Sequence, residues 1–254
     1  MVLLVGLVSD EALRELIRAG GSGEVRFAGD PAGLGRLVTE VRPRGLVVEV
    51  GRPGLWKSHE VVGALAALDD LPPVLVCWHP SVPAARELVG LSTLVSDLRV
   101  VVPGYEDVGL AVKGLVGSVP SGGESVILRG VSPVLVPPSS QVVVGAVVAG
   151  RRRVWLSQLA RCCGLSVRTM QRWLKGAGLP PPARLLGWCI SLHALWWLDL
   201  QAWPERKVCQ QMGFSSCSAL SRYVKRHVGA APAVLRRKLG FAGLLDGFKD
   251  LLCR

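Results

Sequence analysis

Two stretches decide the fold of the C-terminal half: residues 159–175, LARCCGLSVRTMQRWLK, and residues 208–225, VCQQMGFSSCSALSRYVK. Each has an apolar-patterned segment, a turn of glycine, apolar residue and serine, and a second segment with a basic face. Gly164 and Gly213 lie 49 residues apart, and the segments after them repeat at an offset of 50. Two helices joined by a glycine turn form a helix-turn-helix, whose second helix enters the DNA major groove. The sequence therefore predicts two such units.

Helical spacing divides each second segment into an apolar and a polar face. Met170 and Leu174 are expected to face inward in the first unit, and Leu220, Val224 and Val228 in the second. The opposite positions i, i+3, i+4 and i+7 are Arg168, Gln171, Arg172 and Lys175, then Ser218, Ser221, Arg222 and Lys225. Arginine can bond guanine and glutamine adenine, while serine and lysine more often reach phosphates. A merely solvated charged surface would explain one such face, but two in register favour DNA contact.

The charge of the chain is unevenly distributed. The net charge is +11, of which residues 1–120 contribute −3 and residues 121–254 contribute +14. A basic half joined to a slightly acidic half is typical of a nucleic-acid binder with a separate module that does not bind nucleic acid.

The N-terminal part alternates strand-like and helix-like segments. The expected strands are 2–8, 24–28, 45–50, 74–78 and 99–102. The expected helices are 10–19, 31–41, 58–68, 82–89 and 106–116. Short Val/Leu-rich strands alternating with helices predict an α/β fold, a flavodoxin-like doubly wound parallel sheet.

The domain plan follows from composition. We expect an α/β domain over residues 1–117, a Ser/Gly/Pro-rich linker over 118–138, an all-helical domain over 139–240 and a C-terminal tail over 241–254. Within the helical domain, an apolar helix at roughly 184–198 is expected to act as a strut that fixes the separation of the two units.

Cysteine usage and hydropathy restrict the other functional classes. None of the seven cysteines forms a Cys-x-x-Cys pair or has a histidine at ligand spacing, so we expect no zinc site and no cofactor. We expect the cysteines to be buried, reduced thiols in a reducing cytosol. Cys217 is the exception, because it lies at the start of the second recognition helix, and a redox role is an alternative for it. The uncharged apolar stretch between Arg184 and Asp199 has 14 residues, which is too short to span a bilayer, and we expect a cytoplasmic protein.

The second unit resembles a known family. Residues 213–225 follow the pattern G-F-x-S-x-S-x-F-x-R-x-F-K of the AraC/XylS family of bacterial transcription regulators, with Leu220 and Val224 at its aromatic positions, and Gly229 and Pro232 follow. Residues 159–166 match the first unit of that family's DNA-binding domain. The resemblance implies base contacts from Arg168, Gln171, Arg172, Cys217, Ser218, Ser221 and Arg222. For the phosphates we expect Lys175, Ser216, Lys225 and Arg226.

Residues 1–117 resemble a response-regulator receiver domain, less specifically. Residues 43–54 parallel the strand that ends in the phosphoacceptor aspartate, and Glu49 takes that degenerate position. Gly6 and Leu7 stand where the family has its acidic pair, and Val102 stands where it has lysine. Magnesium binding and phosphoryl transfer need those groups, so a pseudo-receiver is expected. Glu49 could imitate a permanent negative charge or pair with Arg52.

The leading interpretation is a transcription regulator, not an enzyme, that binds double-stranded DNA through residues 140–240. RNA polymerase is a further candidate partner. A second copy of the chain is another, and it would dimerise through residues 1–117. The alternative is a small-molecule sensor or an enzyme-derived α/β domain whose ligand controls DNA binding. In open α/β sheets ligands bind at the carboxyl ends of the strands. Here that rim offers Ser9, Asp10, Glu49, Arg52, Trp78 and His79.

Overall fold

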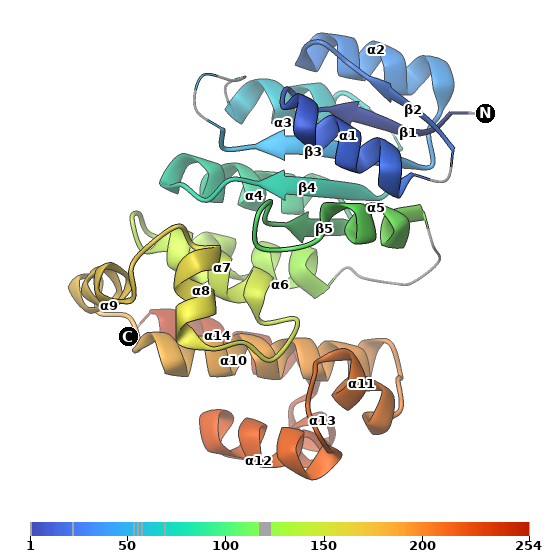
Figure 1. Ribbon diagram of the computed structural model, residues 1–254. Coiled ribbons are helices and arrows are strands. Elements are labelled where there is room, and N and C mark those ends of the chain that lie inside the picture. The colour runs from blue at the N-terminus through green and yellow to red at the C-terminus, as the bar shows by residue number, and fades with distance from the viewer. Residues whose placement is uncertain are drawn as a thin grey trace. The chain divides into compact units, whose positions relative to one another are not determined.

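The computed structural model describes residues 2–21, 23–52, 54, 56, 58–68, 70–116 and 123–253 (Figure 1). The chain divides into two compact units, Met1–Ser125 and Val126–Arg254. No helix among the described residues is both long and apolar enough to cross a membrane.

The first unit is built on a parallel sheet of five strands. The strands are β1 (Val2–Leu7), β2 (Glu24–Phe27), β3 (Gly45–Val50), β4 (Val74–Trp78) and β5 (Leu98–Val101). Their order is β2-β1-β3-β4-β5, which is the flavodoxin-like order. Every residue of β3 and β4 is buried, as expected of valine-rich strands covered on both faces. The predicted parallel α/β sheet is thereby confirmed.

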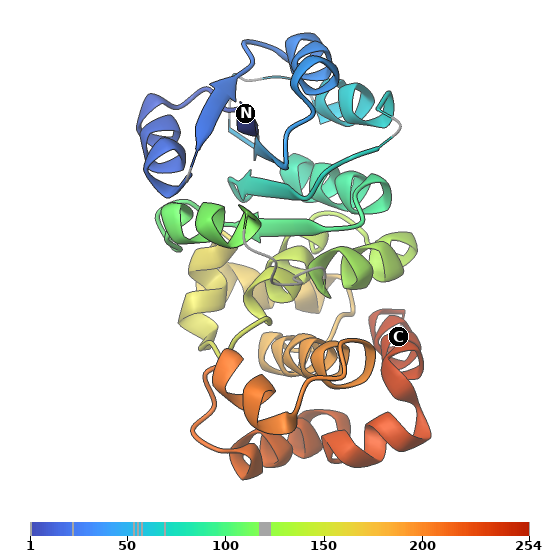
Figure 2. The same ribbon diagram turned by 90° about the vertical axis from the view of Figure 1, so that its right-hand side faces the viewer.

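Five helices alternate with these strands. They are α1 (Glu11–Gly20), α2 (Pro31–Val41), α3 (Ser58–Ala66), α4 (Val82–Leu94) and α5 (Val108–Val116). Helix α1 packs on α5, whereas α3 packs on α2 and α4, so the two groups cover opposite faces of the sheet (Figures 1 and 2). The side chains of Asp10, Asp30 and Ser81 cap α1, α2 and α4 by accepting backbone N–H hydrogen bonds. All ten predicted elements are present, although α4 ends five residues beyond the expected Val89.

The prediction of a linker over residues 118–138 is wrong for residues 123–134, which are helical. Residues 118–122 lie outside the described residues, but Gly123–Val131 form helix α6, and a 3-10 turn follows at Ser132–Val134. Ile127, Leu128 and Val131 of α6 are fully buried. The glycines and prolines on either side of this short amphipathic segment concealed its helical spacing.

The second unit is helical around α7 (Ser140–Ala149) and α10 (Pro182–Leu195), which continues as a π-helical turn, η2 (Trp196–Leu200). All ten residues of α7 are buried, and α7 packs against α10. His193 Nε2 of α10 donates a hydrogen bond to the Val147 carbonyl of α7 at 2.8 Å, which anchors the two helices. The predicted strut is therefore present as α10, beginning two residues before the expected Arg184.

The expected C-terminal tail, residues 241–254, is a packed helix instead. Helix α14 (Gly240–Leu252) follows the short α13 (Pro232–Lys238) and packs against α10. The Phe248 ring stacks on Trp188 with the centroids 6.0 Å apart. The apolar residues of α14 recur at helical spacing, at Phe241, Leu244, Leu245, Phe248, Leu251 and Leu252, and all are buried. This spacing was available in the sequence and predicts burial.

Candidate nucleic-acid interface

The structure contains both predicted helix pairs. The first is α8 (Leu156–Cys162) with α9 (Val167–Gly176), and the second is α11 (Glu205–Gln211) with α12 (Cys217–Val228). We call them unit A and unit B. Both α9 and α12 contact α10, and α12 lies on the opposite side of α10 from α7 (Figures 1 and 2).

The turns of unit A and unit B share one backbone geometry. Gly164 and Gly213 have φ of +64° and +73°, a region that favours glycine because it lacks a Cβ atom. The next residue in each unit donates its N–H back to the first helix: Leu165 to the Ala160 carbonyl, and Phe214 to the Cys209 carbonyl, both at 2.9 Å. These bonds satisfy carbonyls that the helix end leaves unpaired. The repeat seen in the sequence is thus a repeat in structure.

A serine caps the second helix of each unit. Ser166 Oγ accepts from the Thr169 N–H at 3.0 Å, and Ser216 Oγ accepts from the Ala219 N–H at 3.1 Å. Ser216 was expected to contact a phosphate, and its hydroxyl oxygen is instead engaged at the start of α12. Its hydroxyl proton still has the freedom to donate to an anion at this helix N-terminus.

The apolar face of each second helix is buried. Met170 and Leu220 are fully buried, and Leu174 and Val224 are at most 1% exposed. Val228, also expected inward, is half-buried. Burial of these faces fixes which side of α9 and α12 meets solvent.

The polar faces point outward as expected. The exposed members are Arg168, Gln171, Arg172, Lys175, Ser216, Ser218, Arg222, Lys225 and Arg226, while Cys217 and Ser221 are half-buried. Within the described part of the chain, neither Arg172 nor Arg222 forms an ion pair, so both guanidinium groups are free to meet a partner. The sequence interpretation overlooked further exposed basic side chains on neighbouring helices, which a count of charge per helix would have found: Arg161, Arg206, Lys207, Arg237 and Lys238.

Close packing against α10 positions α12. A Cβ atom at Gly187 of α10 would lie 2.2 Å from Cγ of His227, so only glycine allows this approach. The Tyr223 ring lies between those of Phe214 and His227, with centroids 5.5 and 4.5 Å away. Burial raises the pKa of Tyr223 to about 12. Burial and the nearby Arg226 lower the pKa of His227, which keeps its ring neutral at neutral pH.

Unit A is anchored to α7 by a buried polar contact. The Gln141 side-chain amide donates to the Cys163 carbonyl at 2.7 Å, at the end of α8. Since Gln141 is only 4% exposed, this bond satisfies a carbonyl that α8 leaves free and holds the turn before α9.

Three possible metal ligands meet in unit B. One ligand atom each from Glu205, Cys209 and Cys217 lies within 4.8 Å of the other two. Burial, together with a hydrogen bond to the Cys217 thiol, raises the pKa of Cys209 to about 12. Sequence spacing gave no signal for this cluster because Cys217 belongs to a different helix from the other two residues.

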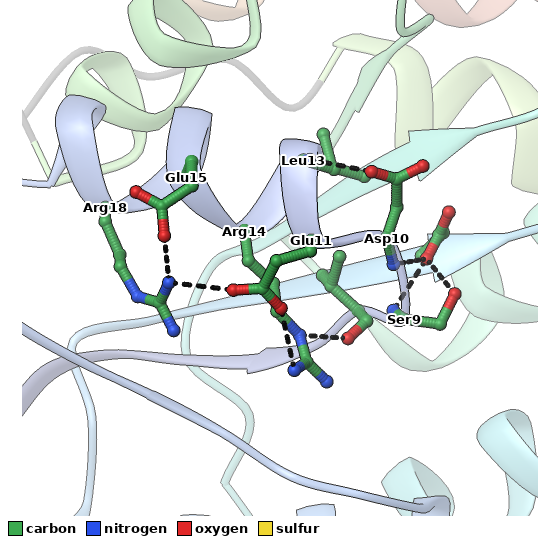
Figure 3. Close-up of polar contacts among 9 residues, drawn as sticks. Ser9, Asp10, Glu11, Leu13, Arg14, Glu15 and Arg18 are labelled. Atoms are coloured by element: carbon green, nitrogen blue, oxygen red, sulfur yellow. Dashed lines mark hydrogen bonds and ion pairs between the residues drawn. The ribbon is translucent and has the colours of Figure 1, made fainter.

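In the first unit, five of the six predicted rim residues come together around Glu49, whereas Trp78 is a fully buried residue of β4 with no bond to this cluster among the described contacts. The Ser9 N–H and hydroxyl donate to Glu49 Oε2 at 2.8 and 3.0 Å, and His79 Nε2 lies 3.0 Å from Oε1. Arg52 lies 3.4 Å from Glu49 and also bonds Asp10. Burial opposes ionisation of Glu49, but the hydrogen bonds from His79 and Ser9 outweigh it and lower its pKa to about 2. Figure 3 shows Ser9 and Asp10 beside the ion pairs of α1.

Glu49 is only 2% exposed, and Leu7, Trp78 and Val102 around the receiver-like positions are also buried. Partners surround the Glu49 carboxylate on both oxygens, including the expected Arg52. The arrangement therefore favours a structural ion cluster around Glu49, with Arg52 as one of its partners.

One comparison with known proteins gives a match. The profile of a family described as "Helix-turn-helix domain" matches residues 159–238, which span α8 to α13. Residues 159–238 form an AraC-type helix-turn-helix domain. No curated protein and no solved structure matched the chain. The match supports a DNA-binding transcription regulator, and it extends from within α8 of unit A through unit B.

Proposed function

We propose that this regulator reads DNA with two recognition helices, α9 of unit A and α12 of unit B, placed in successive major grooves of one duplex. The observation that carries the proposal is the matched geometry of the units. The turns, caps and buried faces repeat, so each unit presents its polar face in the same way. Helix α10, which contacts both recognition helices, would fix their separation.

The proposed division of labour follows side-chain chemistry. Arg172 and Arg222 occupy matching positions, and an arginine can bond guanine bidentately. The remaining base contacts are proposed for Arg168, Gln171, Cys217, Ser218 and Ser221. Contacts to phosphates, which set orientation and affinity but not sequence, are proposed for Lys175, Ser216, Lys225 and Arg226.

The first unit is proposed to be a pseudo-receiver that regulates or dimerises the protein without being phosphorylated. The buried and fully engaged carboxylate of Glu49 supports this, since a phosphoacceptor has to meet a phosphodonor and magnesium. RNA polymerase and a second copy of the chain remain proposed partners. If the unit were instead a small-molecule sensor, native mass spectrometry of the purified chain would show a retained ligand.

The DNA-binding proposal is tested by titrating the full chain against duplex DNA at several salt concentrations. Affinity should fall steeply with salt, because phosphate contacts release counterions. Arg222→Ala should weaken binding, whereas Arg36→Ala, which removes the same charge from the exposed surface of α2, should not. Equal losses in the two variants would show that net charge alone binds DNA.

The pseudo-receiver proposal is tested by incubating the chain with acetyl phosphate and magnesium. The intact mass should stay unchanged. A phosphate adduct on Glu49 or Asp10 would contradict the proposal.

A further inference from the structure

We propose that Glu205, Cys209 and Cys217 form a binding site for a thiophilic divalent metal ion such as zinc, which joins the two helices of unit B. Glu205 and Cys209 are four residues apart on α11, so both project from one face of that helix. Cys217 is the first residue of α12. The site would therefore link the start of the proposed recognition helix to the helix that precedes it.

The distances suit a metal ion. The three ligand atoms lie within 4.8 Å of one another. Ligands in a tetrahedral zinc site with Zn–S bonds of about 2.3 Å are about 3.7 Å apart. The cluster therefore needs a contraction of at most about 1 Å to reach that geometry. Three protein ligands leave a fourth position for water.

Unit A shows that the fold does not require these ligands. Leu156 is the first residue of α8, as Glu205 is of α11, and Val167 is the first residue of α9, as Cys217 is of α12. Ala160 accepts the turn hydrogen bond that Cys209 accepts in unit B. The same backbone thus carries three apolar residues in one unit and three possible metal ligands in the other. The ligands are an addition specific to unit B.

Burial and ligand type favour metal capture at this point. Cys209 is 3% exposed, Cys217 is half-buried and Glu205 is exposed, so the carboxylate lies on the solvent side and the thiols beneath it. Two sulfur ligands select zinc and softer metals over magnesium and calcium, which prefer oxygen.

Metal binding would change how unit B meets DNA. With its sulfur bound to metal, Cys217 could not contact a base, so reading would fall to Ser218, Ser221 and Arg222. This consequence rests on the proposed function, whereas metal binding itself does not.

The test uses the reduced full-length chain and zinc as the probe, with magnesium as a comparison. Competition against a chromophoric chelator should give one zinc per chain. The variant Cys209→Ala/Cys217→Val should lose this zinc while still folding, because it gives unit B the residues that unit A has at those positions. Cys253→Ser removes an exposed cysteine outside the cluster and should retain it. Cobalt substitution should give thiolate-to-metal absorption in the wild type and in Cys253→Ser, and none in Cys209→Ala/Cys217→Val.

Two outcomes would overturn the proposal. The first is unchanged zinc binding by Cys209→Ala/Cys217→Val. The second is a wild-type chain that binds no zinc, whether or not mild oxidation joins Cys209 to Cys217. DNA titration of the same proteins separates the two proposals: zinc binding without DNA binding would defeat the proposed function and leave the metal site standing.

Discussion

Unit A and unit B have the same backbone and different chemistry. A glycine with positive φ, a capping serine and a buried pair of apolar residues repeat in both. The outward faces differ, since unit A offers two arginines and a glutamine where unit B offers two serines and one arginine. The residues between the two helices differ too, since unit A has apolar residues where unit B has Glu205, Cys209 and Cys217. The comparison teaches that a few residues set the helix-turn-helix geometry, which leaves the other positions free to specialise.

The largest expected effects come from the buried faces. Met170→Ala in unit A and Leu220→Ala in unit B remove side chains that are fully buried, at matching positions. Each should lower the free energy of unfolding by about 2–5 kcal/mol, the usual cost of such a cavity. Urea unfolding followed by tryptophan fluorescence measures this. Arg168→Ala, an exposed position of α9, is the control. A loss below about 1 kcal/mol in one unit alone would break the equivalence of the two cores.

The next effect concerns the matched arginines. Arg172→Ala and Arg222→Ala should each weaken binding to the preferred duplex by about 1–3 kcal/mol, the range for a bidentate base contact. Fluorescence anisotropy titration gives both values under one salt condition. If only one of them weakens binding, a single unit reads the DNA.

The serine caps should contribute less. Ser166→Ala and Ser216→Ala each remove an acceptor for a backbone N–H at a helix start. We expect a loss of about 1 kcal/mol in unfolding free energy for each, with Ser216→Gly costing only a few tenths. Chemical unfolding of the three variants tests this. A large loss for Ser216→Gly would mean that Ser216 does more than cap α12.

The smallest and least specific effects are expected from the lysines. Lys175→Ala and Lys225→Ala should weaken binding to all sequences about equally and reduce the salt slope by about 1 each, as loss of a phosphate contact does. Titrations of a preferred and an unrelated duplex at several salt concentrations give both quantities. A change in sequence preference would assign the lysine to a base instead.

Sequence patterns predicted the elements where spacing was regular and local. The strands follow from short Val/Leu-rich runs, the turns at Gly164 and Gly213 from the repeated glycine-apolar-serine pattern, and the buried positions Met170 and Leu220 from spacing of three to four residues. Compositional bias was a poorer guide. Helix α6 lies in a segment whose glycines and prolines predict a linker, and helix α14 lies in the segment expected to be a C-terminal tail. The engagement of Glu49 with Ser9 and His79 and the cluster at Cys209 depend on contacts across the fold. Residue spacing along the chain therefore could not predict those contacts.

The central claim is that each unit reads its own half of one DNA site. Selection of bound sequences from a random duplex library, carried out with the full-length wild type, Arg172→Ala and Arg222→Ala, tests it most directly. The account predicts two half-sites about one helical turn, roughly 10 bp, apart on one face of the duplex. Each variant should lose preference in a different half. If both variants keep the wild-type preference and lose only overall affinity, these arginines anchor the backbone, and the account of two reading helices is contradicted.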